Sequence, residues 1–147
     1  MTSSSAQTEA VRRPTVLFVC THNAGRSQLA AGLAEHRAKG AVRVLSAGTE
    51  PDPVISPEVV ASLAELGIDR SGRVPQLVTA EMVESADVVV SLRPGLPIPL
   101  APGARHEVWP LPDPAGWTLD TIRPLRDHLQ VRVDSLVSDL LSPEQPR

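Results

Sequence analysis

A single cysteine precedes an arginine by six positions near the start of this 147-residue chain. Cys20 follows the apolar run 16–19, and Arg26 stands where a helical pattern begins. A loop of this length can curl so that its backbone N–H groups point at one tetrahedral oxyanion, and the following helix N-terminus adds positive partial charge. A guanidinium supplies two donors in one plane. The spacing therefore predicts a nucleophilic thiolate at the mouth of an anion-binding loop.

The alternative is that Cys20 is a buried, unreactive side chain, which is the more common role of a lone cysteine. A Cys-x5-Arg spacing alone is weak evidence for a catalytic site. The context favours catalysis, since the cysteine ends a strand and the loop carries Asn23 and Gly25. Asn23 is expected to adopt a left-handed backbone conformation. Ser27 is expected to donate a hydrogen bond to the thiolate, to cap the helix, or both. The candidate oxyanion-binding and loop-supporting residues are Thr21, His22, Asn23, Ala24, Gly25, Arg26 and Ser27, with His22 expected at the surface.

Apolar runs alternate with segments of helical periodicity along the chain. This alternation predicts an α/β fold with a parallel sheet and helices on both faces. Four strands are expected, at 15–19, 42–46, 87–91 and 106–109, and the proline-rich stretch 93–103 is expected to be a loop. Helices are expected at 27–39, at 57–67 after the N-cap Ser56, at 80–85 after Thr79, and at 119–141, where Pro124 kinks the helix or begins its main segment.

A carboxylic acid is expected on the same edge of the sheet as the cysteine. Ligands of an open parallel sheet bind at the carboxyl ends of its strands, where both Cys20 and the loop 110–117 belong. Asp113 lies in that loop between two prolines that restrict its backbone. We therefore expect Asp113 to protonate the leaving oxygen as the general acid, the alternative being that the Asp-Pro pair only forms a turn.

Length and composition indicate one catalytic domain at 14–142, with a disordered leader at 1–13 and a tail at 143–147. The leader lacks the apolar segment of a signal peptide, and no apolar run reaches membrane-spanning length. A net charge of −3 offers no basic surface for nucleic acid. One cysteine allows no intramolecular disulfide and favours a reducing cytoplasm. The four histidines lack the spacing of metal ligands, so no metal site is expected.

Several segments together resemble the low-molecular-weight protein tyrosine phosphatase superfamily, which includes thiol-dependent arsenate reductases. They are the loop 20–28, the segment Ser46–Thr49, the Asp-Pro segment 111–116 and the helix start 123–127, and the resemblance covers nearly all of the chain after residue 13. It implies a four-stranded parallel sheet flanked by helices. By this resemblance Cys20 is the nucleophile, Arg26 the oxyanion clamp and Asp113 the general acid, while Asn23 and Ser27 hold the loop and tune the thiolate.

The same resemblance bears on the reaction. Thioredoxin-coupled arsenate reductases use further cysteines after the third strand, where this chain has Pro94 and Ile98. The resemblance therefore implies an arsenate reductase, with a role in arsenical resistance, that has no bound cofactor. By this resemblance an external low-molecular-weight thiol, mycothiol or glutathione, attacks arsenate bound on Cys20, and a redoxin releases arsenite. The proline-rich loop 93–103 is expected beside the anion-binding loop, as a wall of the path by which the thiol approaches.

Two other functions remain open. Tyrosine phosphatases of this superfamily often carry a tyrosine after the Asp-Pro pair, whereas Ala115 and Gly116 follow here, so Trp117 is either the wall of an aromatic slot or a packing residue. The alternative function is a phosphatase that hydrolyses phosphotyrosine or aryl phosphates through a phosphocysteine. A third is a non-catalytic oxyanion-binding or redox-sensing module, which the set of Cys20, Arg26 and Asp113 disfavours because a pure binder needs no general acid.

Overall fold

A computed structural model describes residues 13–111 and 117–142 of the chain. Its sheet has four parallel strands in the order β2-β1-β3-β4, which confirms the predicted fold class. The strands are β1 (Thr15–Cys20), β2 (Arg43–Gly48), β3 (Val88–Ser91) and β4 (His106–Val108), whose ends lie within two residues of the predicted ones. Cys20 is the last residue of the central strand β1, at the carboxyl edge of the sheet.

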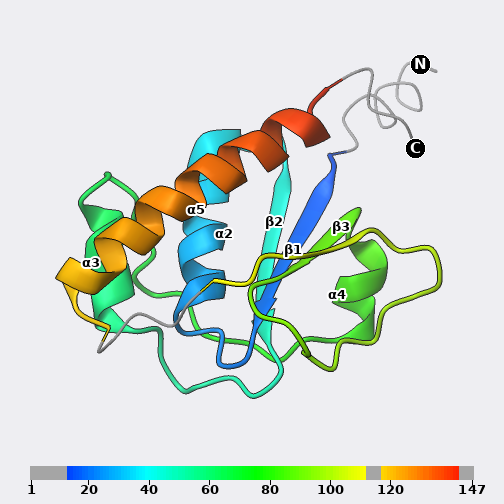
Figure 1. The fold of residues 1–147 in the computed structure, drawn as a ribbon, viewed down its shortest axis with the longest axis horizontal. Coiled ribbons are helices and arrows are strands. Elements are labelled where there is room, and N and C mark those ends of the chain that lie inside the picture. The colour runs from blue at the N-terminus through cyan, green and yellow to red at the C-terminus, as the bar shows by residue number, and fades with distance from the viewer. Residues whose placement is uncertain (1–12, 112–116, 143–147) are drawn as a thin grey trace.

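Helices cover both faces of the sheet (Figure 1). Helices α2 (Arg26–Ala38), α3 (Pro57–Ala64) and α5 (Leu119–Leu140) pack on one face, where Val16, Phe18 and Cys20 of β1 belong to the larger apolar cluster. The short helix α4 (Ala80–Ser85) lies over the other face, against Leu17 and Val19. Strand β1 is buried on both sides, which is why its sequence is continuously apolar rather than alternating.

The caps of α3 and α4 agree with the sequence, but three other details of the helices do not. The backbone N–H of Val59 donates to Ser56 Oγ at 3.4 Å, and that of Met82 donates to Thr79 Oγ1 at 3.1 Å. Helix α3 ends at Ala64 rather than at Gly67. Helix α5 runs from Leu119 through Pro124, so that proline does not begin its main segment. The capping role of Ser27 is also wrong, because α2 begins at Arg26 after the N-cap Gly25.

Several sequence predictions fall partly or wholly outside the described residues. The leader, apart from Arg13, and the tail 143–147 lie outside them, as does the stretch 112–116 that contains Asp113. The proline-rich segment 93–103 contains no helix or strand, as predicted. Across residues 13–111 and 117–142, no helix combines the length and the apolar character needed to cross a membrane.

An ion-pair cluster joins α5 to the end of α3. Arg123 Nη2 lies 2.6 Å from Glu65 Oε2, and Arg126 Nη1 lies 2.7 Å from Glu65 Oε1. Hydrogen bonds from Arg123, and to a smaller extent from Arg126, lower the pKa of Glu65 from 4.5 to about 2. Because the folded state holds this carboxylate ionised more strongly than the unfolded chain does, its contribution to stability is complete above pH 4.5 and is lost as the pH falls towards 2.

We expect Glu65→Gln to lower the free energy of unfolding at pH 7, and we expect the difference from the parent protein to shrink as the pH falls from 4.5 to 2. Urea unfolding at a series of pH values measures this difference. The control is Glu84→Gln on α4, since Glu84 makes no ion pair within the described residues. A difference for Glu65→Gln that stays constant down to pH 2 would contradict the prediction.

Candidate active site

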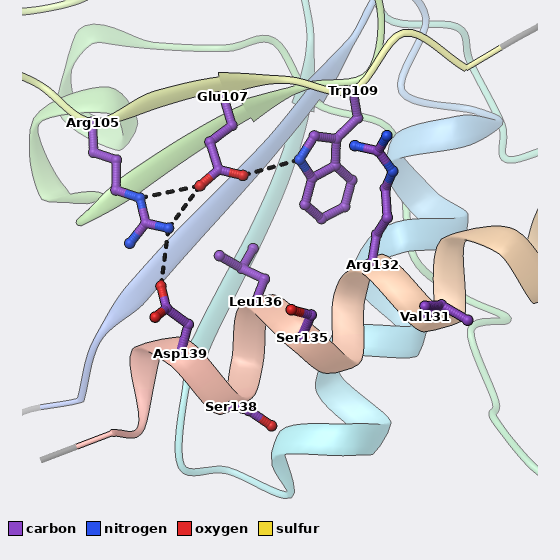
Figure 2. A pocket seen from close by; sticks show the side chains of 9 residues that line it. All are labelled: Arg105, Glu107, Trp109, Val131, Arg132, Ser135, Leu136, Ser138 and Asp139. Atoms are coloured by element: carbon purple, nitrogen blue, oxygen red, sulfur yellow. Dashed lines mark hydrogen bonds and ion pairs between the residues drawn. The ribbon is translucent and has the colours of Figure 1, made fainter. Parts of the chain in front are cut away.

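At least two cavities open on the described part of the molecule. One, of about 690 Å³, lies between β4 and α5, and three of its charged side chains bind one another (Figure 2). There, Arg105 Nη2 bridges Glu107 and Asp139 at 2.7 and 3.1 Å, and Trp109 Nε1 donates to Glu107 at 3.0 Å. No cysteine lines this groove. The other cavity, of about 500 Å³, is lined by Cys20, and we take it as the candidate active site.

The Cys20 cavity gathers most of the residues that the sequence predicted. Cys20 ends β1, and the five residues Thr21–Gly25 connect it to α2. The predicted residues that line the cavity are Cys20, Thr21, His22, Ala24, Gly25 and Arg26. Asn23 and Ser27 are fully buried and do not line it. Asp113 lies outside the described residues, so the predicted general acid has no described position.

The loop turns its carbonyl oxygens outward. The chain that follows β2 runs beside it, and four of its backbone N–H groups donate to loop carbonyls at 2.7–3.2 Å: Thr49, Glu50, Asp52 and Ser56 bind the oxygens of Cys20, Thr21, His22 and Ala24, respectively. In a trans peptide the C=O and the next N–H point in opposite directions. The loop N–H groups therefore point away from this segment.

These N–H groups are the donors that an oxyanion needs. Within the described residues, the backbone N–H groups of Thr21, His22, Ala24 and Gly25 have no acceptor in the protein, although all four residues line the cavity. Such a nest of unpaired donors at the start of a helix binds anions through both hydrogen bonds and the helix dipole. The loop is thus built to hold a tetrahedral anion beside the Cys20 sulfur.

Two buried side chains support the loop from behind. Asn23 has a φ of 52°, the left-handed conformation that was predicted, and its backbone N–H lies 3.3 Å from Cys20 Sγ. Its side-chain Nδ2 donates to Ser27 Oγ at 2.7 Å, and that oxygen lies 3.0 Å from Cys20 Sγ. The predicted contact of Ser27 with the sulfur is therefore confirmed, and both groups can donate to a thiolate.

Arg26 ties the loop to the segment after β4. Its Nη1 donates to the carbonyl of Leu111 at 2.7 Å, immediately before the stretch that contains Asp113. Arg26 also lines the cavity, where a guanidinium can bind an anion. This geometry agrees with the predicted clamp.

An aromatic side chain closes one side of the cavity. Trp117 packs so closely on Gly25 that a Cβ at that glycine would stand 2.6 Å from the indole ring. A glycine is therefore needed at this point of the loop. Trp117 is half-buried, lines the cavity and also packs against the core, so it is both a wall of the cavity and a packing residue.

Sequence reasoning missed part of the cavity wall. The cavity is also lined by Asp52 and Ser56, from the turn after β2, and by Pro57, the first residue of α3. A signal for them was available, because that turn follows the carboxyl end of β2 and so meets the same edge of the sheet as Cys20. Arg93 also lines the cavity, with Nη1 2.9 Å from Thr21 Oγ1. This position agrees with the expectation that the proline-rich loop, which begins at Arg93, lies beside the site.

His22 is exposed at the rim, as predicted from the sequence. Its Nδ1 lies 3.1 Å from the Glu50 carbonyl oxygen and 3.3 Å from Asp52 Oδ1. These contacts hold the imidazole towards the adjacent turn. In the described part of the chain, no group of three His, Cys, Asp or Glu side chains is placed to hold a metal ion.

Comparisons with known proteins agree with this geometry. Residues 15–96 match the family model described as low molecular weight phosphotyrosine protein phosphatase. A glutaredoxin arsenate reductase of Synechocystis is 34% identical over 128 residues, which cover 85% of this chain and 97% of that protein. A solved structure of an arsenate reductase in the phosphate binding state shares 34% identity and a TM-score of 0.75, covering 86% of this chain and 98% of its own. A low molecular weight protein tyrosine phosphatase from T. tengcongensis shares 26% identity and a TM-score of 0.78, covering 87% and 100%.

Proposed function

This chain belongs to the low molecular weight phosphotyrosine protein phosphatase family, a family of enzymes, and we propose that it is an arsenate reductase that uses an external low-molecular-weight thiol. The observation that carries the proposal is the position of the chain's only cysteine beside a loop of unpaired N–H donors. Arsenate and phosphate share shape and charge, so this loop suits either anion. Relatives named arsenate reductase favour the first.

The proposed reaction assigns one role to each group. The Cys20 thiolate attacks the arsenic atom, and an arsenate oxygen leaves as water after protonation. The loop N–H groups and Arg26 stabilise the negative charge on the other oxygens. Asp113 is our proposed proton donor, on the grounds of its place in the sequence and the family resemblance alone.

The electron balance requires a second thiol. Reduction of arsenate to arsenite takes up two electrons, which two thiols supply when they join in one disulfide. The chain contains one cysteine, so it cannot form such a disulfide by itself. An external thiolate attacks the arsenic bound on Cys20, a new As–S bond forms, and the Cys20 thiolate leaves. A redoxin thiolate then attacks the sulfur of this adduct, an S–S bond forms between the two external thiols, and the As–S electron pair leaves with arsenite.

The chemical class of the partners follows from this balance, since each must supply a thiol. Mycothiol or glutathione is the class of co-substrate that we propose, with a matching redoxin and no resident cofactor. A free catalytic thiol persists in a reducing compartment, so we also propose that the enzyme works in the cytoplasm.

Arsenite formation with different reductants tests the proposal. We expect no turnover of arsenate with thioredoxin, its reductase and NADPH alone. Adding mycothiol with mycoredoxin, or glutathione with glutaredoxin, is expected to give turnover that the Cys20→Ser variant lacks. Vigorous reduction with thioredoxin alone would overturn the external-thiol mechanism. No reduction with any of these thiols, together with robust hydrolysis of p-nitrophenyl phosphate, would favour the phosphatase function.

The phosphatase remains the second candidate because of one observation. Trp117 stands in the cavity wall, where its indole ring can pack against the ring of an aryl phosphate. Attack of Cys20 on phosphorus would expel the aryl oxygen, and water would then hydrolyse the phosphocysteine. Parallel assays of p-nitrophenyl phosphate and arsenate on one preparation separate the two functions.

A further inference from the structure

A buried arginine lies behind the anion-binding loop. Arg70 is 3% exposed and comes from the segment between α3 and α4. Its Nη1 lies 2.7 Å from Glu35 Oε1, and its Nη2 donates to Ser46 Oγ at 3.4 Å. Burial lowers the pKa of this guanidinium and Glu35 offsets part of the effect, yet the group keeps its proton and offers donors only. A buried cation is costly unless its donors are satisfied, so its partners must hold defined orientations.

Arg70 begins a chain of buried hydrogen bonds that ends on the cysteine sulfur. Its Nε donates to Gln28 Oε1 at 2.7 Å. Gln28 Nε2 donates to Asn23 O at 3.0 Å and to Asn23 Oδ1 at 3.2 Å. Asn23 Nδ2 donates to Ser27 Oγ at 2.7 Å, which lies 3.0 Å from Cys20 Sγ.

The direction of donation is fixed along this chain. Because a guanidinium cannot accept, the amide oxygen of Gln28 must face Arg70 and its NH2 group must face Asn23. The backbone N–H of Gln76 donates to Asn23 Oδ1 at 2.9 Å, so Asn23 must present its NH2 group to Ser27. The Ser27 oxygen accepts that bond, which leaves the hydroxyl proton for the sulfur. A thiolate only accepts hydrogen bonds, so this orientation favours the thiolate.

We propose that Arg70 and Gln28 are positioning residues for the nucleophile: they orient Asn23 and Ser27 so that the Ser27 hydroxyl donates to the Cys20 thiolate. Neither Arg70 nor Gln28 lines the cavity, so both act through the loop. The inference rests on the proposed role of Cys20 as the nucleophile. The test is the rate at which an alkylating agent reacts with the Cys20 thiolate, and this rate does not depend on arsenate. A negative result in this test is therefore distinct from a failure of the proposed arsenate reaction.

The sharpest test is Gln28→Glu. Glutamate has the same shape and keeps an acceptor for Arg70, but it has no N–H for the two Asn23 oxygens. We expect the rate of alkylation by iodoacetamide at pH 7 to fall roughly tenfold, as for loss of one hydrogen bond to a charged group. The urea midpoint is expected to be retained, because the new carboxylate pairs with Arg70. Cys20 is the only cysteine, so alkylation reports on it alone.

A matched control and a second pair of variants complete the test. Gln130→Glu on α5 adds the same charge where no hydrogen bond is made within the described residues, and should react at the parent rate. Arg70→Met should also lower the rate about tenfold, and Arg70→Lys, which again offers donors only, should recover most of it. A folded Gln28→Glu protein that reacts at the parent rate would overturn the proposal. If that variant does not fold, equal rates for Arg70→Met and the parent protein would overturn it.

Discussion

Replacing Cys20 by serine is expected to abolish turnover while the fold and oxyanion binding persist. Serine preserves the shape of the site, and the loop N–H groups that bind the anion belong to other residues. A hydroxyl is a poor nucleophile unless a base takes its proton. The described groups within hydrogen-bond distance of the Cys20 sulfur are the Ser27 hydroxyl and the Asn23 N–H, and neither is a base.

Two measurements on the same protein check this prediction. Initial rates with arsenate and with p-nitrophenyl phosphate should fall to background, a loss of about 10⁴-fold or more. Titration with inorganic phosphate should give a dissociation constant close to that of the parent protein. Cys20→Ala provides the control, since it should bind phosphate equally well. Measurable turnover by the serine variant would remove Cys20 from the mechanism.

The sequence predicted the fold and the Cys20–Ser27 loop because the patterns that indicate them are local. The Val run of β3 and the apolar β1 mark buried strands, and the spacing from Cys20 to Arg26 lies within one loop and one helix start. Such patterns are governed by backbone geometry and burial, which a short window of sequence contains. The contact of Ser27 with the sulfur was also foreseeable, since both residues flank the same loop.

The residues that support this loop from behind, such as Arg70, could not be predicted in this way. Arg70 stands 42 positions from Gln28 and lies in a segment with ordinary turn composition. Its burial depends on how the chain after α3 passes under the loop, which no local pattern specifies. The outward-facing loop carbonyls likewise depend on pairing with the segment Thr49–Ser56. In both cases the information lies in long-range packing.

Replacing Arg26 by lysine is expected to damage catalysis nearly as much as replacing it by alanine. The guanidinium gives one donor, Nη1, to the Leu111 carbonyl at 2.7 Å, and the same side chain lines the cavity where an anion would bind. A lysine ammonium is a compact charge that cannot present two parallel donors in one plane. It also cannot serve Leu111 and two anion oxygens in the same fixed geometry. Charge alone therefore replaces only a small part of what Arg26 does.

We expect kcat/KM to fall by about 10²–10³-fold in both variants, the scale for losing a group that stabilises charge in the transition state. Steady-state kinetics with arsenate and with p-nitrophenyl phosphate measure the loss. Arg132→Lys provides the matched control, because Arg132 lies over the ring of Trp109 in the groove between β4 and α5, away from Cys20. A near-normal kcat for Arg26→Lys would show that positive charge is sufficient. A large loss for lysine and alanine alike would show that the planar arrangement of donors, shared between Leu111 and the oxyanion, is what this position contributes.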